Sequence, residues 1–174
     1  MKRLNKISLG MALLFASAST LAYDGTVNFN GEIIDNTCVV SLGDNGNSLI
    51  VPMGSVNKSS FTGKGSVAST TQFTLTLTDC PAVNARVKFD GPTYDGDQDV
   101  LALNAGGAGA AEGVGIQIYD QNMTKLPLFT ASNPYELQEK VANNLKFYAS
   151  YIATAATVSP GPANAVATFT MNYN

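Results

Sequence analysis

The sequence predicts an all-β sandwich, and two observations support this prediction. Short segments with strand patterns recur along the chain, and clusters rich in glycine, asparagine and aspartate separate them. Short strands at this spacing are typical of two packed antiparallel sheets. The strand-like segments that follow the N-terminal region are 49–56, 71–78, 85–89, 100–103, 114–119, 145–154 and 165–173, and the turn-forming clusters are 43–47, 89–97 and 104–113.

The N-terminal region has the pattern of a secretory signal peptide. Three basic residues, Lys2, Arg3 and Lys6, precede the apolar run 7–16, which gives way to small residues ending at Ala22. This run is too short for a stable membrane anchor, and no later segment approaches the roughly 20 apolar residues of a transmembrane helix. We therefore expect residues 1–22 to be removed on export and the mature chain to begin at Tyr23.

The mature chain is expected to form one acidic domain. Removing 22 of 174 residues leaves 152, which is enough for one sizeable core. The signal peptide carries three of the ten basic residues and none of the thirteen acidic ones, so the mature balance is 7 − 13 = −6. A surface of this charge is a poor partner for nucleic acid or anionic lipid.

A strand pattern stands at the very start of the mature chain. Val27, Phe29, Gly31 and Ile33 fall on one face, while polar side chains fall on the other. This alternation is typical of a half-buried strand. The alternative interpretation is that the segment is simply the first strand of the protein's own sheet.

The two cysteines of the chain, Cys38 and Cys80, both lie in the mature part. Export to an oxidising compartment favours a disulfide between them. Closing a loop of about 43 residues in this way stabilises a fold by about 4 kcal/mol on the chain-entropy estimate. A catalytic thiol or a metal pair is less favoured, because the chain has no histidine to serve as base or ligand.

One segment, 133–144, has the pattern of a short helix. Asn133 and Pro134 are suited to starting a helical turn, and Leu137 and Val141 would then face inward. We therefore expect one or two helical turns at this place in an otherwise all-β chain.

No catalytic constellation emerges from the sequence. Asp95, Asp97 and Asp99 have the alternating spacing of a calcium loop, but the glycine and the bidentate glutamate of such a loop are missing. The glycine-rich segment 106–113 matches neither phosphate-binding pattern. Four scattered glutamates do not define a glycosidase pair. We therefore predict no enzyme, no cofactor, no metal site and no small-molecule substrate.

The C-terminal segment alternates as cleanly as the N-terminal one. The residues on one face are Ala165, Ala167, Phe169, Met171 and Tyr173. Since only one residue follows Tyr173, we expect the edge beside this strand to be exposed or to be paired by something else.

Further motifs stand at defined places along the chain. The alternating segment 26–34 contains a central glycine, Gly31, and Cys38 follows seven residues later. Cys80 lies in a "DCP" stretch shortly after the strand pattern "FTLTL".

The end of the chain adds two features to this set. In the segment 151–174, Tyr173 is the penultimate residue and Gly161 is fourteenth from the end. In this combination, order and spacing, the chain resembles the pilin subunits of the bacterial chaperone–usher pathway, particularly the major rod subunits of type 1-like fimbriae. The resemblance covers the whole mature chain.

This resemblance implies an incomplete immunoglobulin-like sandwich that lacks its seventh strand and is completed by donor-strand exchange. Residues 23–34 would be the donor extension and residues 35–174 the pilin domain. Val27, Phe29 and Ile33 would enter the groove of another copy, and Gly31 would pass where a side chain does not fit. The acceptor groove and chaperone-facing edge would be formed by Gly161, Ala165, Ala167, Phe169, Met171 and Tyr173. The disulfide would tie the first strand of the domain to the second.

The function implied is that of a structural subunit which polymerises head to tail into a fimbrial rod for adhesion. Its partners would be identical or related pilins, a periplasmic chaperone and an outer-membrane usher. The subunit would pass through the periplasm to the cell surface. The alternatives are a minor or tip-associated pilus subunit and a secreted lectin-like binding domain.

Overall fold

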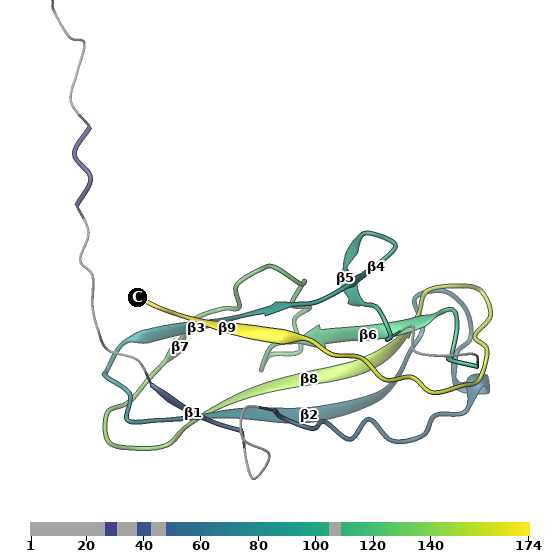
Figure 1. Ribbon diagram of the computed structural model, residues 1–174, viewed down its shortest axis with the longest axis horizontal. Coiled ribbons are helices and arrows are strands. Elements are labelled where there is room, and N and C mark those ends of the chain that lie inside the picture. The colour runs from purple at the N-terminus through teal and green to yellow at the C-terminus, as the bar shows by residue number, and fades with distance from the viewer. Residues whose placement is uncertain (1–26, 31–37, 43–47, 105–108) are drawn as a thin grey trace, which may run out of the picture. The chain divides into compact units, whose positions relative to one another are not determined.

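The computed structural model describes residues 27–30, 38–42, 48–104 and 109–174 (Figure 1). The chain divides into two units, residues 1–34 and residues 35–174, and each is considered by itself. Within the described residues the second unit is all-β apart from one short 3₁₀ turn, η1 (Lys58–Ser60). The all-β prediction is therefore confirmed. None of the described residues forms a helix long and apolar enough to cross a membrane.

The larger sheet has six strands in the order β1-β2-β8-β6-β5-β4. Its longest ladder joins β2 to β8 from Val67↔Ile152 to Leu77↔Asn143. An irregularity lies between Ala68 and Thr70, where Ser69 adopts a φ of +53°. The strands are β1 (Val39–Ser41), β2 (Val67–Thr78), β4 (Thr93–Tyr94), β5 (Asp97–Leu101), β6 (Val114–Tyr119) and β8 (Asn143–Ala153).

The smaller sheet has three strands in the order β7-β3-β9. Its central strand β3 (Asn84–Asp90) lies between β7 (Tyr135–Glu136) and β9 (Thr168–Tyr173), and both pairs are antiparallel. Because β9 pairs only with β3 among the described residues, it forms an edge of this sheet.

Aromatic side chains from both sheets meet in the core. The ring of Phe147 on β8 lies 5.6 Å from that of Phe73 on β2, and 5.2 Å from that of Phe89 on β3. Phe169 on β9 contacts Phe89 at 6.3 Å, and Tyr135 contacts Phe147 at 5.5 Å. Phe147 is fully buried, whereas Phe73 and Phe169 are only half-buried. The core is therefore less well covered on the side of these two rings.

The opposite side of the sandwich is closed by the segment 126–137. Its backbone donates hydrogen bonds to both sheets, from Leu128 N to Gln98 O at 2.8 Å and from Phe129 N to Phe89 O at 2.8 Å. Ser132 strengthens this closure, since its backbone N–H donates to Val87 O and its hydroxyl accepts from Val87 N.

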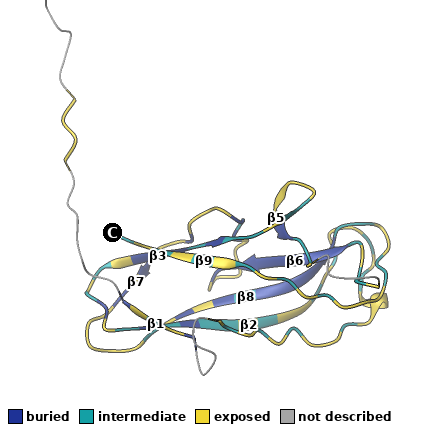
Figure 2. Ribbon diagram, in the orientation of Figure 1, coloured by how far each residue is buried: buried dark blue, intermediate teal, exposed yellow. Residues whose placement is uncertain are grey.

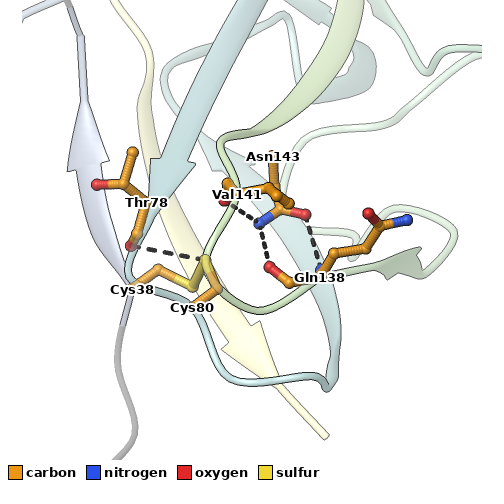
Figure 3. The surroundings of a disulfide bond; sticks show 6 residues. All are labelled: Cys38, Thr78, Cys80, Gln138, Val141 and Asn143. Atoms are coloured by element: carbon orange, nitrogen blue, oxygen red, sulfur yellow. Dashed lines mark hydrogen bonds between the residues drawn. A yellow bond between two sulfur atoms is a disulfide. The ribbon is translucent and has the colours of Figure 1, made fainter.

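The predicted disulfide is confirmed. Cys38 and Cys80 are bonded and buried, with their Cα atoms 4.5 Å apart, and the bond joins the start of β1 to the chain that leaves β2 (Figure 3). The turn before β8 lies beside it, where the Asn143 side chain accepts a hydrogen bond from Gln138 N and donates to Gln138 O. The disulfide therefore secures the point at which the domain begins.

Two expectations from the sequence are wrong. Residues 133–144 form β7 and a turn rather than a helix, because Leu137 N donates to Val83 O beside β3 and Lys140 adopts a φ of +61°. Val141, expected to face inward, is exposed. Residues 49–56 form no ladder with any described residue, Pro52 within them has no N–H to donate, and Gly54 adopts a φ of +71°.

The segment that leads into β9 is fixed by a close backbone approach at Gly161. Ala111 N donates to Pro162 O at 3.0 Å, and Ser159 N donates to Glu112 O at 3.1 Å. A Cβ atom at Gly161 would overlap backbone atoms of residues 109–111. Only glycine therefore fits between these two segments without movement of the backbone.

We predict that Gly161→Ala destabilises the domain by about 1 to 3 kcal/mol, because the added methyl group overpacks a rigid backbone contact. Urea unfolding of the mature protein measures the loss. Val166→Ala is the matched control, since Val166 lies in the same segment and is 62% exposed, and a change within about 0.5 kcal/mol is expected there. Equal stabilities of Gly161→Ala and the wild type would contradict the prediction.

Candidate strand-binding groove

The outer edge of β9 carries a row of backbone groups without a partner in the described structure. Asn84 and Asn174 exchange both of their backbone hydrogen bonds, at 2.9 and 3.2 Å. In an antiparallel pair such exchanges recur at every second residue. The N–H and C=O groups of Phe169, Met171 and Tyr173 therefore point away from β3. This edge can accept a further strand.

The side chains of the same three residues share one face of the strand. Together with three alanines before β9, they are half-buried against the core, while the residues between them are exposed. Figure 2 shows the contrast between β8, which is largely dark blue, and β9, which is not. The half-buried row consists of Ala163, Ala165, Ala167, Phe169, Met171 and Tyr173.

A second wall is formed by chain that lies along the free edge of β2. β1 pairs with the last residues of β2, and farther along this edge Met53 O accepts a hydrogen bond from the Ser69 hydroxyl. Leu49, Val51 and Met53 are half-buried, whereas Ile50 and Pro52 between them are exposed. This is the burial pattern of a strand that has no ladder partner in the described part of the chain.

The floor between the two walls is apolar. Val40 on β1 and Phe73 on β2 are partly buried against the core, as are Leu49 and Met53 from the second wall. A single extended segment placed here would complete the cover over Phe73 and Phe169, and it could pair with β9 along one of its edges. We therefore treat this region as a candidate groove for one strand.

A pocket of about 300 Å³ lies where the chain leading into β9 faces the loop around η1. Tyr151 at this pocket donates its hydroxyl hydrogen to Ala163 O at 3.1 Å, and burial raises the pKa of this tyrosine. The other lining residues come mainly from 54–61 and 158–164 and include Val56, Phe61, Val158, Gly161 and Pro162. Ser55, Lys58, Ser159 and Asn164 also line it, so the pocket offers polar as well as apolar contacts.

The structure brings together most of the residues that the sequence assigned to the groove. Ala165, Ala167, Phe169, Met171 and Tyr173 share one face, and the exposed Gly161 lies at the pocket. The sequence did not indicate the second wall or the pocket. The apolar run 49–53 is a sequence signal for a strand, but it does not reveal that this strand lacks a ladder partner.

The predicted donor residues are only partly within the described structure. In the first unit Val27 is 76% exposed and Phe29 is 92% exposed. Gly31 and Ile33 lie outside the described residues. Two large apolar side chains in an extended segment are therefore presented without a core to cover them.

The acidic stretch considered as a calcium loop is a hairpin turn between β4 and β5. Asp99 N donates to an Asp97 carboxylate oxygen at 3.0 Å, and the Asp99 carboxylate lies 3.9 Å from Lys125 Nζ. Among the described residues no group of three potential ligands is arranged to hold a metal ion.

Comparison with known proteins agrees with this geometry. The chain is 38% identical over 173 residues to "Probable major fimbrial subunit LpfA" of Escherichia coli O157:H7, which covers 98% of this chain and 93% of that protein. It is 37% identical over 175 residues to "Type-1 fimbrial protein, A chain" of Escherichia coli K12, with 98% and 94% covered.

Solved structures share the fold. The Burkholderia pseudomallei antigen and type I fimbria protein BPSL1626 has a TM-score of 0.62 at 33% identity, over 79% of this chain and 95% of that one. The P pilus rod subunit PapA, at 22% identity over 79% of this chain and 99% of that one, shows the fold alone with a TM-score of 0.64. The family model "Fimbrial protein" matches residues 27–174, and this chain, an all-β pilin with an incomplete immunoglobulin-like sandwich, belongs to that family.

Proposed function

We propose that this protein is a structural rod subunit of a bacterial fimbria and polymerises head to tail by donor-strand complementation. The observation that carries the proposal is the free edge of β9, with its half-buried apolar row. The exposed Val27 and Phe29 of the N-terminal segment supply side chains that such a groove would bury. The segment 23–34 of one copy would fill the groove of the domain 35–174 of the next.

The energetics favour this arrangement. Burying Val27, Phe29 and Ile33 contributes about 5 to 9 kcal/mol at about 1.5 to 3 kcal/mol each. Each backbone hydrogen bond to the β9 edge adds about 1 kcal/mol. These gains are comparable with the whole stability of a small domain. A subunit with an empty groove is therefore expected to be barely stable.

Such a subunit needs protection before assembly. A periplasmic chaperone would supply a temporary strand along the edge from Ala165 to Tyr173, and an outer-membrane usher would exchange it for the extension of the next subunit. The signal peptide expected at residues 1–22 would deliver the chain to the periplasm, and the fibre would stand on the cell surface. A solved relative at 24% identity is described as part of a "Chaperone-Usher pilus".

The names of two of the similar proteins favour a rod position over a tip position. One is called a major fimbrial subunit and another the A chain of a type-1 fimbria. A structural role also agrees with the groove, which offers backbone groups and apolar side chains to a strand. Nothing in this role requires a catalytic residue.

Deleting residues 24–34 while keeping Cys38 should leave a domain that still binds the chaperone but cannot act as a donor. SDS-resistant polymer ladders should vanish on gels, while chaperone complexes persist in pull-downs. Fibres formed by the deleted protein would show that another segment is the donor.

Gly31→Leu should block or greatly slow assembly. A side chain at this position would overpack the groove, and the overpacking would cost about 1 to 3 kcal/mol of binding free energy. Phe29→Ala, which removes bulk from the same face, should only weaken the fibre. The rate of polymer formation measures both. The argument fails if Gly31→Leu assembles at the wild-type rate.

Moving residues 24–34 to a position after Asn174, joined by a four-residue Gly/Asn linker, should let the segment fold back antiparallel beside Phe169, Met171 and Tyr173. The contact then becomes intramolecular. We expect a monomer that is soluble without chaperone, far more heat-stable than the truncated domain, and unable to polymerise.

Thermal unfolding and size-exclusion chromatography of the moved and truncated proteins test this expectation. If residues 24–34 were instead the native first strand of this domain, the move would leave a loose apolar tail and promote aggregation. A moved protein no more stable than the truncated one would defeat the missing-strand proposal.

A further inference from the structure

The two ends of the folded domain carry opposite net charge. We call residues 54–66, 109–113 and 154–164 the loop end, and residues 38, 78–84, 135–143 and 173–174 the disulfide end. In Figure 1 the C-terminus marks the disulfide end, and the loops on either side of η1 mark the opposite one. The strands β2 and β8 run from one end to the other.

The loop end is weakly basic. Its charged residues are Lys58, Lys64 and Glu112, all exposed, which gives +2 − 1 = +1. Neither lysine lies within 4.0 Å of a carboxylate among the described residues, where the ion pairs are Lys88–Asp90 and Lys125–Asp99. Lys58 lines the pocket at the end of the groove. Both ammonium groups are therefore available to a partner at the groove mouth.

The disulfide end is acidic. Asp79, Glu136 and Glu139 are exposed there with one basic residue, Lys140, which gives −3 + 1 = −2. Arg86 at the neighbouring part of β3 is turned to Ser132 O, to which its guanidinium donates at 2.9 Å. In the sequence, Glu32 and Asp35 precede this end and have the same sign.

The N-terminal extension is attached to the disulfide end through Cys38. Five residue steps separate Ile33 from Cys38, and a chain of this length spans at most about 18 Å. When the extension of one copy lies in the groove of another, the disulfide end of the donor must therefore lie close to one mouth of that groove.

Only one of the two mouths allows a fibre to grow. Suppose that each donor placed its disulfide end against the disulfide end of its acceptor. Every copy would then use its disulfide end twice, once as donor and once as acceptor, so a third copy would find this surface already occupied and the fibre would stop growing. When the donor's disulfide end instead meets the acceptor's loop end, the donor's own loop end stays free for the next copy. The open head-to-tail fibre requires this second arrangement.

We propose that the loop end of one copy, through Lys58 and Lys64, is the docking surface for the acidic disulfide end of the next copy. This inference rests on the proposed function, and it identifies the surfaces through which two copies would meet. Ile33 then lies nearest the pocket at Gly161 and Val27 nearest Tyr173. The donor strand consequently runs antiparallel to β9.

The test reverses the charge at one end at a time in the mature full-length protein. K58E/K64E makes both ends acidic, and D79K/E139K makes both ends basic. Each variant should form SDS-resistant polymer about tenfold more slowly than the wild type at low ionic strength, with a smaller difference in high salt. The protein with all four substitutions has complementary ends again and should regain the wild-type rate.

The control variant K125E/K146E changes the net charge by the same amount as K58E/K64E at residues outside the loop end, and should assemble at the wild-type rate. A neutral peptide of residues 25–34 carrying Glu32→Gln has no attached domain and should bind the grooves of all these proteins equally. The inference is overturned if K58E/K64E assembles as fast as the control, or if the fourfold variant stays as slow as either double variant. Failure of the peptide to bind, together with failure of the wild type to polymerise, would instead overturn the proposed function on which the inference rests.

Discussion

Backbone groups of Phe169, Met171 and Tyr173 point out of the smaller sheet, and no described residue pairs with them. An unpaired strand edge is normally covered, twisted away or charged, because it attracts other strands. Here the edge lies instead beside a row of half-buried apolar side chains. One extended segment could provide both the hydrogen bonds and the apolar cover that this edge lacks, and the proposed assembly rests on this need.

Other described segments hold the elements around this edge in place. Segment 126–137 bonds to both sheets on the far side of the sandwich, and the Ser132 hydroxyl takes the place of a strand partner for Val87. On the open side, the disulfide holds β1 against β2, and the backbone contact at Gly161 positions the chain that enters β9. The segments on both sides of the candidate groove are therefore anchored by contacts within the described domain.

Polarity of the fibre follows from where the extension is attached. In the proposed fibre each copy would bring its disulfide end to the groove of another copy, because the extension is joined to the domain at that end. The lysines at the loop end and the carboxylates at the disulfide end would favour this proposed orientation of two copies by opposite charge. In this view the groove stabilises the junction between two copies, and the charged ends orient the two copies and raise the rate at which they assemble.

Local alternation was sufficient to predict much of this protein. Patterns of period two located β2, β3, β6, β8 and β9, and they assigned Ala165, Ala167, Phe169, Met171 and Tyr173 to one face. This succeeded because side chains of a strand alternate between two faces whatever its partners are. The export signal and the absence of histidine similarly favoured the disulfide before any geometry was known.

Tertiary structure decided which extended segments have partners. Segment 49–53 has the apolar composition of a strand yet pairs with no described residue, and 133–144 has helical signals yet joins β3 through β7. The pocket at Gly161 and the opposite charges of the two ends arise from residues far apart in the chain. A sequence pattern reports the face on which a side chain lies, whereas pairing and proximity depend on long-range contacts that local periodicity does not contain.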